Sequence, residues 1–134
     1  MFGSISWRKC TIANGAALSD VIDMTGRTLV CIYQPASCEG TAFGLQGSYD
    51  YDPVKLTGSF TSIYNVIQEA TGAAPVTALW EVAKSATVAQ IINLPAPFQV
   101  TGPNYIKIRS EDGSNAATNQ SGDAVLYLGF VDIR

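Results

Sequence analysis

The last third of the chain contains two short apolar runs that leave little choice of fold. In Tyr105–Arg109, Ile106 and Ile108 alternate with longer polar side chains, which is the period-two pattern of a strand with one buried face. The run Ala124–Asp132 is apolar at successive positions, so both of its faces need cover. That cover would come either from the inside of a sandwich or from another protein chain.

Turn signals recur along the whole chain at intervals of roughly ten residues, as at Asn14-Gly15, Asp52-Pro53 and Gly102-Pro103. Short β-favouring runs lie between them, a rhythm typical of all-β proteins. We therefore predict one all-β domain over residues 1–134, an antiparallel β-sandwich of jelly-roll type. The predicted strands are Ile5–Ile12, Asp20–Asp23, Thr28–Tyr33, Thr41–Tyr49, Phe60–Val66, Thr77–Val82, Thr87–Leu94, Tyr105–Arg109 and Ala124–Asp132.

One segment, Ser59–Thr71, fits two structures. Ile63, Val66 and Ile67 fall at helical spacing, the first serine could cap a helix, and Gly72 could end it. The same segment is rich in β-branched and aromatic residues, which favour strands. We predict a strand that runs through Val66.

The chain carries few charges. Charged residues are 14% of the sequence, against about 25% in an ordinary soluble domain, while apolar residues are 47%. Neutral and apolar side chains must therefore face outward, which is typical of a subunit that buries surface in a larger assembly. A surface rich in neutral polar residues is the alternative.

Charge and hydropathy also predict which partners are absent. The net charge is −3 and the eight basic residues are scattered, with only Arg8 and Lys9 adjacent, so we expect no nucleic-acid binding. No apolar run approaches the roughly 18 residues of a membrane span, so we expect no membrane insertion. The residues Met1–Arg8 lack the basic start and apolar core of a signal peptide, and we expect folding in a cytoplasm.

The three cysteines, Cys10, Cys31 and Cys38, fit a reducing compartment. Their odd number and their spacing match neither a disulfide framework nor a zinc site, so we predict free thiols. A bridge between Cys10 and Cys38 is the alternative that the sequence leaves open.

Residues for catalysis are scarce. The chain has no histidine, which removes the commonest general base and the Ser-His and Cys-His nucleophile pairs. Neither a phosphate-binding loop nor a dinucleotide-binding fingerprint is present. We predict a protein without catalytic residues and without a cofactor.

Acidic residues offer two candidate calcium sites, Asp50-Tyr51-Asp52 and Glu111-Asp112-Gly113-Ser114. Each lacks further ligands at defined spacing and coincides with turn chemistry, so we interpret both as turns and predict no metal site. A glycosidase-like carboxylate pair could also be chosen from Asp50, Asp52, Glu81 and Glu111, but any acidic protein offers such a choice.

Aromatic residues suggest a sugar-binding face as another possibility, because aromatic rings stack on sugars. Their spacing within alternating strands favours a place in the core and at interfaces instead. The residues in question are Trp7, Trp80, Tyr49, Tyr51, Tyr64 and Tyr105.

Five segments of the chain resemble a group of small β-sandwich accessory virion proteins of tailed phages, similar in size and strand plan to capsid decoration, or cement, proteins. These segments are Thr11–Ser19, Gly26–Ile32, Phe43–Asp50, Tyr105–Ser110 and Asn119–Asp123. The chain departs from that pattern in extra residues at Asp52–Gly58 and in the break at Pro95–Pro97.

The resemblance implies a non-enzymatic structural protein on the capsid surface, assembled in the host cytoplasm. Its expected partners are the major capsid protein lattice and further copies of itself, as a homotrimer by analogy with decoration proteins. Two rival functions stay open at this stage: a component of the phage tail or fibre, and a carbohydrate-binding β-sandwich module.

Overall fold

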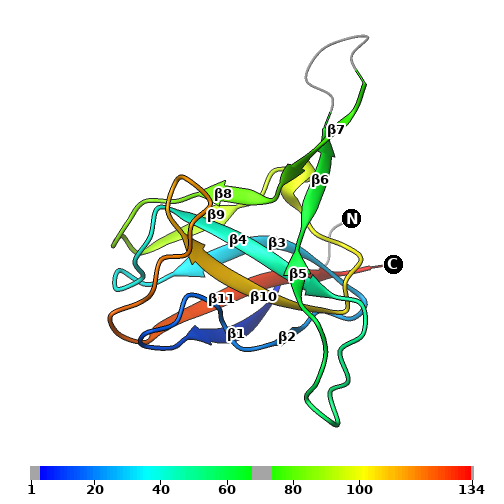
Figure 1. The fold of residues 1–134 in the computed structure, drawn as a ribbon, viewed down its shortest axis with the longest axis horizontal. Coiled ribbons are helices and arrows are strands. Elements are labelled where there is room, and N and C mark those ends of the chain that lie inside the picture. Colours follow the sequence, from blue (N-terminus) through cyan, green and yellow to red (C-terminus); the bar gives the residue numbers. More distant parts are fainter. Residues whose placement is uncertain (1–3, 68–73, 134) are drawn as a thin grey trace.

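The computed structural model describes residues 4–67 and 74–133, and its regular secondary structure is almost entirely β-strand (Figure 1). A single turn of 3-10 helix, η1 (Ala96–Phe98), is the helical element within the described ranges. The strands are β1 Ser6–Ile12, β2 Ile22–Asp23, β3 Arg27–Gln34, β4 Ala42–Ser48, β5 Thr61–Ser62, β6 Tyr64–Ile67, β7 Val76–Leu79, β8 Glu81–Ala83, β9 Gln90–Asn93, β10 Tyr105–Glu111 and β11 Ala124–Asp132.

Two antiparallel sheets face each other. The first has the strand order β1-β11-β3-β9, and the second has the order β2-β10-β4-β5. Strand β8 pairs with β4 on the same edge as β5, but with an earlier part of β4. This arrangement confirms the predicted all-β antiparallel sandwich, whereas the jelly-roll connectivity stays a prediction.

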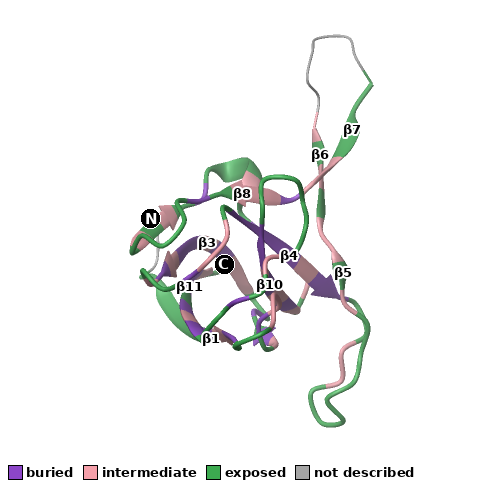
Figure 2. Ribbon diagram, turned by 60° about the vertical axis from the view of Figure 1, so that its left-hand side comes forward, coloured by how far each residue is buried: buried purple, intermediate pink, exposed green. Residues whose placement is uncertain are grey.

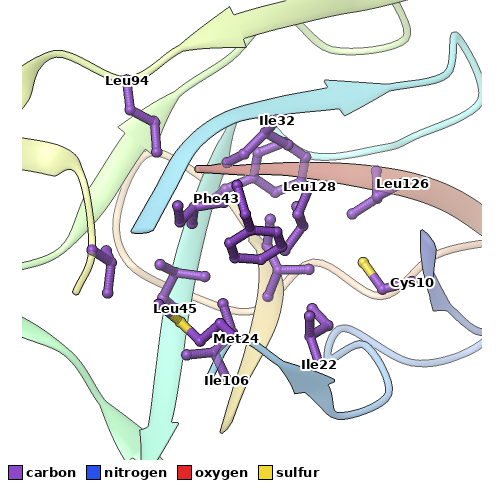
Figure 3. Packing of buried hydrophobic residues seen from close by; sticks show 14 of the residues in the cluster. Cys10, Ile22, Met24, Ile32, Phe43, Leu45, Leu94, Ile106, Leu126 and Leu128 are labelled. Atoms are coloured by element: carbon purple, nitrogen blue, oxygen red, sulfur yellow. The ribbon is translucent and has the colours of Figure 1, made fainter. Parts of the chain in front are cut away.

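The core lies between the sheets. Strand β11 is central in the first sheet, and its inward side chains Leu126, Leu128 and Phe130 are fully buried. Opposite them, Ile106 and Ile108 of β10 are fully buried as well, which confirms the alternation predicted for that strand. Figure 3 shows how such side chains from both sheets meet in one cluster.

The other face of β11 is open. Val125, Tyr127 and Val131 point away from the core, and Tyr127 is 38% exposed. The two-sided cover predicted for Ala124–Asp132 is therefore supplied by this chain on one side only. Cover from another protein chain, the second alternative, stays a prediction.

Strand β4 differs from its sequence pattern in the opposite direction. In the sequence of Thr41–Tyr49, Phe43, Leu45 and Tyr49 alternate with small or polar residues, which predicts one buried face, but nearly every residue of β4 is buried. The reason is that side chains from distant segments cover its glycines: Pro103 lies over Gly47, and the Glu111 carboxyl group lies over Gly44. Glycine at both positions makes this close approach possible.

Two predicted strands are each divided in the structure. The chain turns inward at Ile63 between β5 and β6, and at Trp80 between β7 and β8, where the Trp80 N–H donates to the Ile63 carbonyl at 2.8 Å. Beyond this point β6 and β7 pair with each other alone and project past both sheets (Figure 1).

The helical alternative for Ser59–Thr71 is wrong over Thr61–Ile67, which contains β5 and β6. The end of that segment, residues 68–71, lies outside the described residues. The remaining strands match their predicted positions with ends shifted by a few residues, the largest change being the shortening of Thr87–Leu94 to Gln90–Asn93.

Two neighbouring substitutions on β11 test this assignment of faces. Leu128→Asp places a carboxylate in the core, and we expect it to cost several kcal/mol and to abolish cooperative unfolding. Tyr127→Asp introduces the same residue on the open face and should cost about 1 kcal/mol. Thermal unfolding followed by circular dichroism compares the two, and similar melting temperatures would contradict the assignment.

Candidate functional site

The outward face of the first sheet carries an apolar surface, which we call the aromatic face and define as Trp7, Tyr33, Ile91 and Tyr127. Strand pairing brings these residues together, because Tyr127 lies opposite Tyr33, and Tyr33 lies opposite Ile91. They surround a shallow hollow of about 470 Å³. Trp7 is 43% exposed and Ile91 is 61% exposed, so the surface is open to a partner.

The side chains of the aromatic face pack against each other and against the sheet beneath them. Tyr33 and Tyr127 pack with their ring centroids 6.0 Å apart. Gly129 lies opposite Trp7 on the neighbouring strand, and a side chain at Gly129 would collide with Cys31 Sγ and approach the Trp7 ring. Glycine at this position therefore lets the indole lie close to the sheet. Lys9 is the charged residue in the row of paired residues that contains Tyr127, Tyr33 and Ile91, and it lies beside Tyr127 at the edge of the aromatic face.

A second apolar surface lies on the projecting pair of strands, which we call the arm and define as Tyr64–Ile67 and Val76–Leu79. Residues paired across an antiparallel ladder share a face. Tyr64 therefore shares one face with its partner Leu79, and Val66 shares it with Thr77. On this outward face Tyr64 is 58% exposed and Val66 is 72% exposed.

The opposite face of the arm borders the body of the molecule. Asn65 Nδ2 donates to the Pro97 carbonyl at 3.1 Å. Asn65, Ile67 and Ala78 line a hollow of about 420 Å³ together with Leu79 at the base of the arm and with Glu81, Phe98 and Asn115. The arm is thus anchored along one face, and its outward face is left without cover from the described part of the chain (Figure 2).

A pair of carboxyl groups lies on the outer side of the second sheet. Glu81 pairs with Gly44 from one side and Arg109 pairs with it from the other, and the Glu111 carboxyl group lies over the same glycine. Glu111 is 3% exposed, and its Oε2 is 3.4 Å from Arg109 Nε. Its Oε1 has no hydrogen-bond partner among the described residues.

Burial and, after it, the hydrogen bond to the Glu81 carboxyl group raise the pKa of Glu111, Arg109 opposes both effects, and the pKa that results is about 7. Two carboxyl groups in contact cannot both be ionised cheaply, so at neutral pH the pair shares a proton for part of the time. Glu81 borders the hollow beside the arm, but Glu111 does not line it.

The other acidic candidates form turns, as their sequence context indicated. Asp50 accepts a hydrogen bond from the Ser59 N–H at 2.8 Å, and Asp52 accepts one from the Val54 N–H at 2.9 Å. Asp112 accepts one from the Ser114 N–H at 2.7 Å. Of the four residues considered as a carboxylate pair, the structure brings together Glu81 and Glu111 and leaves Asp50 and Asp52 in a separate loop.

The aromatic residues singled out in the sequence do not form one face. Trp80 is completely buried and donates from Nε1 to the Phe98 carbonyl at 2.9 Å. Tyr51 and Tyr105 pack together, with ring centroids 4.9 Å apart. Trp7 belongs to the aromatic face and Tyr64 to the arm, while Tyr49 is exposed in a loop. Sequence reasoning missed Tyr33, Ile91 and Tyr127 as partners of Trp7, because strand pairing alone brings them together.

The three cysteines are buried free thiols. Burial raises the pKa of Cys10 to about 12 and also raises the pKa values of Cys31 and Cys38. A thiol that stays protonated is a poor nucleophile, so none of the three has the thiolate character that cysteine catalysis needs.

Comparison with protein-family models, with curated proteins and with solved structures finds no match to this chain. Within the described ranges, no helix has the length and apolar character needed to cross a membrane. The surfaces and the carboxyl pair are therefore interpreted from their own geometry.

The carboxyl pair predicts an unusual pH dependence. Below about pH 4.5 Glu111 is protonated whether the chain is folded or unfolded, and between about 4.5 and 7 only the folded protein keeps the proton. The free energy of unfolding should therefore fall by up to about 3 kcal/mol as the pH rises through this window.

Because the chain has no histidine, thermal unfolding between pH 5 and pH 8 reports mainly on this pair. Glu111→Gln should flatten the slope, since its side chain stays neutral throughout. Glu39→Gln removes a carboxylate elsewhere and serves as the matched control, which should keep the slope. A rise in stability with pH in the parent protein would contradict the assignment.

The cysteines give a further prediction. A thiol reagent added to the folded protein without reductant should react slowly, and after unfolding in denaturant it should titrate three thiols. Titration of a single thiol would show a disulfide, and Cys10 with Cys38 would be the pair to test by mass spectrometry.

Proposed function

We propose that this protein is a non-enzymatic structural subunit of a phage virion that decorates or cements the capsid. The observation that carries the proposal is the aromatic face, an open apolar surface on a sheet whose other side is already packed in the core. Large exposed apolar patches on small proteins mark interaction sites, and tryptophan and tyrosine are the residues that contribute most to protein interfaces.

The composition supports docking on protein rather than on a charged polymer. With few charges and a net charge of −3, the chain offers no electrostatic attraction for nucleic acid. Many copies of a modest apolar contact, repeated over a symmetric lattice, add up to firm attachment through avidity. The identity of that lattice as a capsid rests on the resemblance to accessory virion proteins, and assembly would take place in the host cytoplasm.

Two rival functions remain distinguishable. A tail or fibre component would use the same apolar surfaces at another place on the particle. A carbohydrate-binding module would use Trp7, Tyr33 and Tyr127 as a stacking platform. Sugar sites also need several convergent polar groups, and the hollow is lined by three aromatic residues and one isoleucine. This lining favours a protein partner.

The test uses particles of the phage that encodes the chain. After heads and tails are separated on a density gradient, the protein should be found with the heads in a fixed ratio to the major capsid protein. Added to heads that lack it, the purified protein should bind to saturation, and Tyr127→Asp should weaken this binding by at least about tenfold.

Val54→Asp is the matched control, because Val54 is an exposed apolar residue in a loop outside the aromatic face. It should bind heads as the parent does. Recovery with tails would support the tail component instead. Absence from both fractions, together with glycan binding that is lost in Trp7→Ala, would support the sugar-binding module.

A further inference from the structure

We propose that the arm of one copy packs on the aromatic face of a second copy, so that the chain assembles head to tail into a ring. This inference rests on the proposed structural role: the aromatic face joins neighbouring copies to each other, and the joined copies bind the lattice together, so that Tyr127→Asp weakens head binding through lost avidity. The contact differs from a simple face-to-face dimer, because the two surfaces in contact are different parts of the chain.

The arm leaves apolar side chains without cover. A two-stranded ribbon is at best marginally stable in water by itself, so such side chains gain from burial. One face of the arm leans on the body through Asn65 and Ile67, but the outward face exposes Tyr64 and Val66. Val76, the partner of Ile67 on the opposite face, is 49% exposed near the far end of the described arm.

The arm cannot reach the aromatic face of its own molecule. Figure 2 shows the arm projecting on the side of β4 and β5, whereas β3 and β11 of the first sheet lie on the far side of the body. The base of the arm is fixed to the body, because Trp80 is buried in the core and the Ile63 N–H donates to the Leu45 carbonyl of β4 at 3.0 Å. The contact must therefore be made with another molecule.

The two surfaces match in chemistry. No described residue of the arm is charged, and the aromatic face has Lys9 only at its edge. A charged partner would lose hydration on either surface without gaining an opposite charge. The surface bounded by Trp7, Tyr33, Ile91 and Tyr127 is a shallow hollow, whereas the arm projects from the body (Figure 1) and presents a tyrosine beside a valine.

Each copy then contributes its arm to one neighbour and its aromatic face to the other. A contact between two different surfaces is heterologous, and it closes into a ring when the rotation between copies allows it, or continues as a filament when it does not.

The first experiment measures the mass of the purified protein by sedimentation at micromolar concentration. The parent should form a closed oligomer of defined size. Val66→Glu, on the outward face of the arm, and Ile91→Glu, on the aromatic face, should each weaken association by at least about tenfold. Val54→Glu makes the same change as Val66→Glu at an exposed valine elsewhere and should leave the oligomer unchanged.

The decisive step mixes the two defective variants. Val66→Glu keeps an intact aromatic face, and Ile91→Glu keeps an intact arm, so one productive contact can form between them. The mixture should give a dimer of one copy of each, although neither variant associates alone. Failure of the mixture to associate, when each variant is folded by circular dichroism, would overturn the arm-to-face contact.

Tryptophan fluorescence tests whether the aromatic face is covered in the oligomer. The chain has two tryptophans, of which Trp80 is buried in the core and Trp7 lies on the aromatic face. Acrylamide should quench Trp7 in the unassociated Ile91→Glu variant, and the parent oligomer should resist this quenching. Equal quenching in both would show that the aromatic face stays uncovered and would overturn the proposal.

These outcomes separate this inference from the proposed function. A monomer that still binds phage heads would refute the ring and leave the structural role in place. A ring that is absent from virions would refute the structural role and leave the arm contact in place.

Discussion

The packing of β11 against the second sheet is the interaction on which the rest of the structure depends. Leu126, Leu128 and Phe130 fill the space between the sheets, and Figure 3 shows Leu128 close to Phe43 and Ile32. Because β11 pairs with β1 on one side and β3 on the other, it also fixes the register of the first sheet. The same register that buries the leucines turns Tyr127 outward beside Tyr33. The core and the aromatic face are therefore two consequences of one strand.

The fold was largely predictable from the sequence, because its strands are short and their patterns local. Ile106 and Ile108 identify a half-buried strand by alternation alone, and the turn signals separate it from its neighbours. The breaks at Ile63 and Trp80 were not predictable in the same way. At each break, one residue of a β-favouring run turns inward to the core. Whether it does so depends on the side chains of the opposite sheet, which the local sequence does not show.

The surfaces and the carboxyl pair were harder to predict for a related reason. Trp7, Tyr33, Ile91 and Tyr127 come from four strands that are separate in the sequence, so only the order of the strands in the sheet unites them. Glu81 and Glu111 meet across β4, and the one local signal of this meeting was Gly44 inside a strand pattern. A glycine there indicates close approach by another group, but the sequence does not say which group.

Both halves of the proposed contact are fixed before association. Trp80 holds the base of the arm through its backbone N–H and through its indole, which donates to the Phe98 carbonyl. On the other surface, Gly129 lets Trp7 lie near the sheet, and Tyr33 packs against Tyr127. Little side-chain and backbone freedom is left to lose when such surfaces meet, which lowers the entropic cost of binding. A modest apolar area can then hold copies together, and a chain with few charges can remain stable by burying its neutral surface against its neighbours.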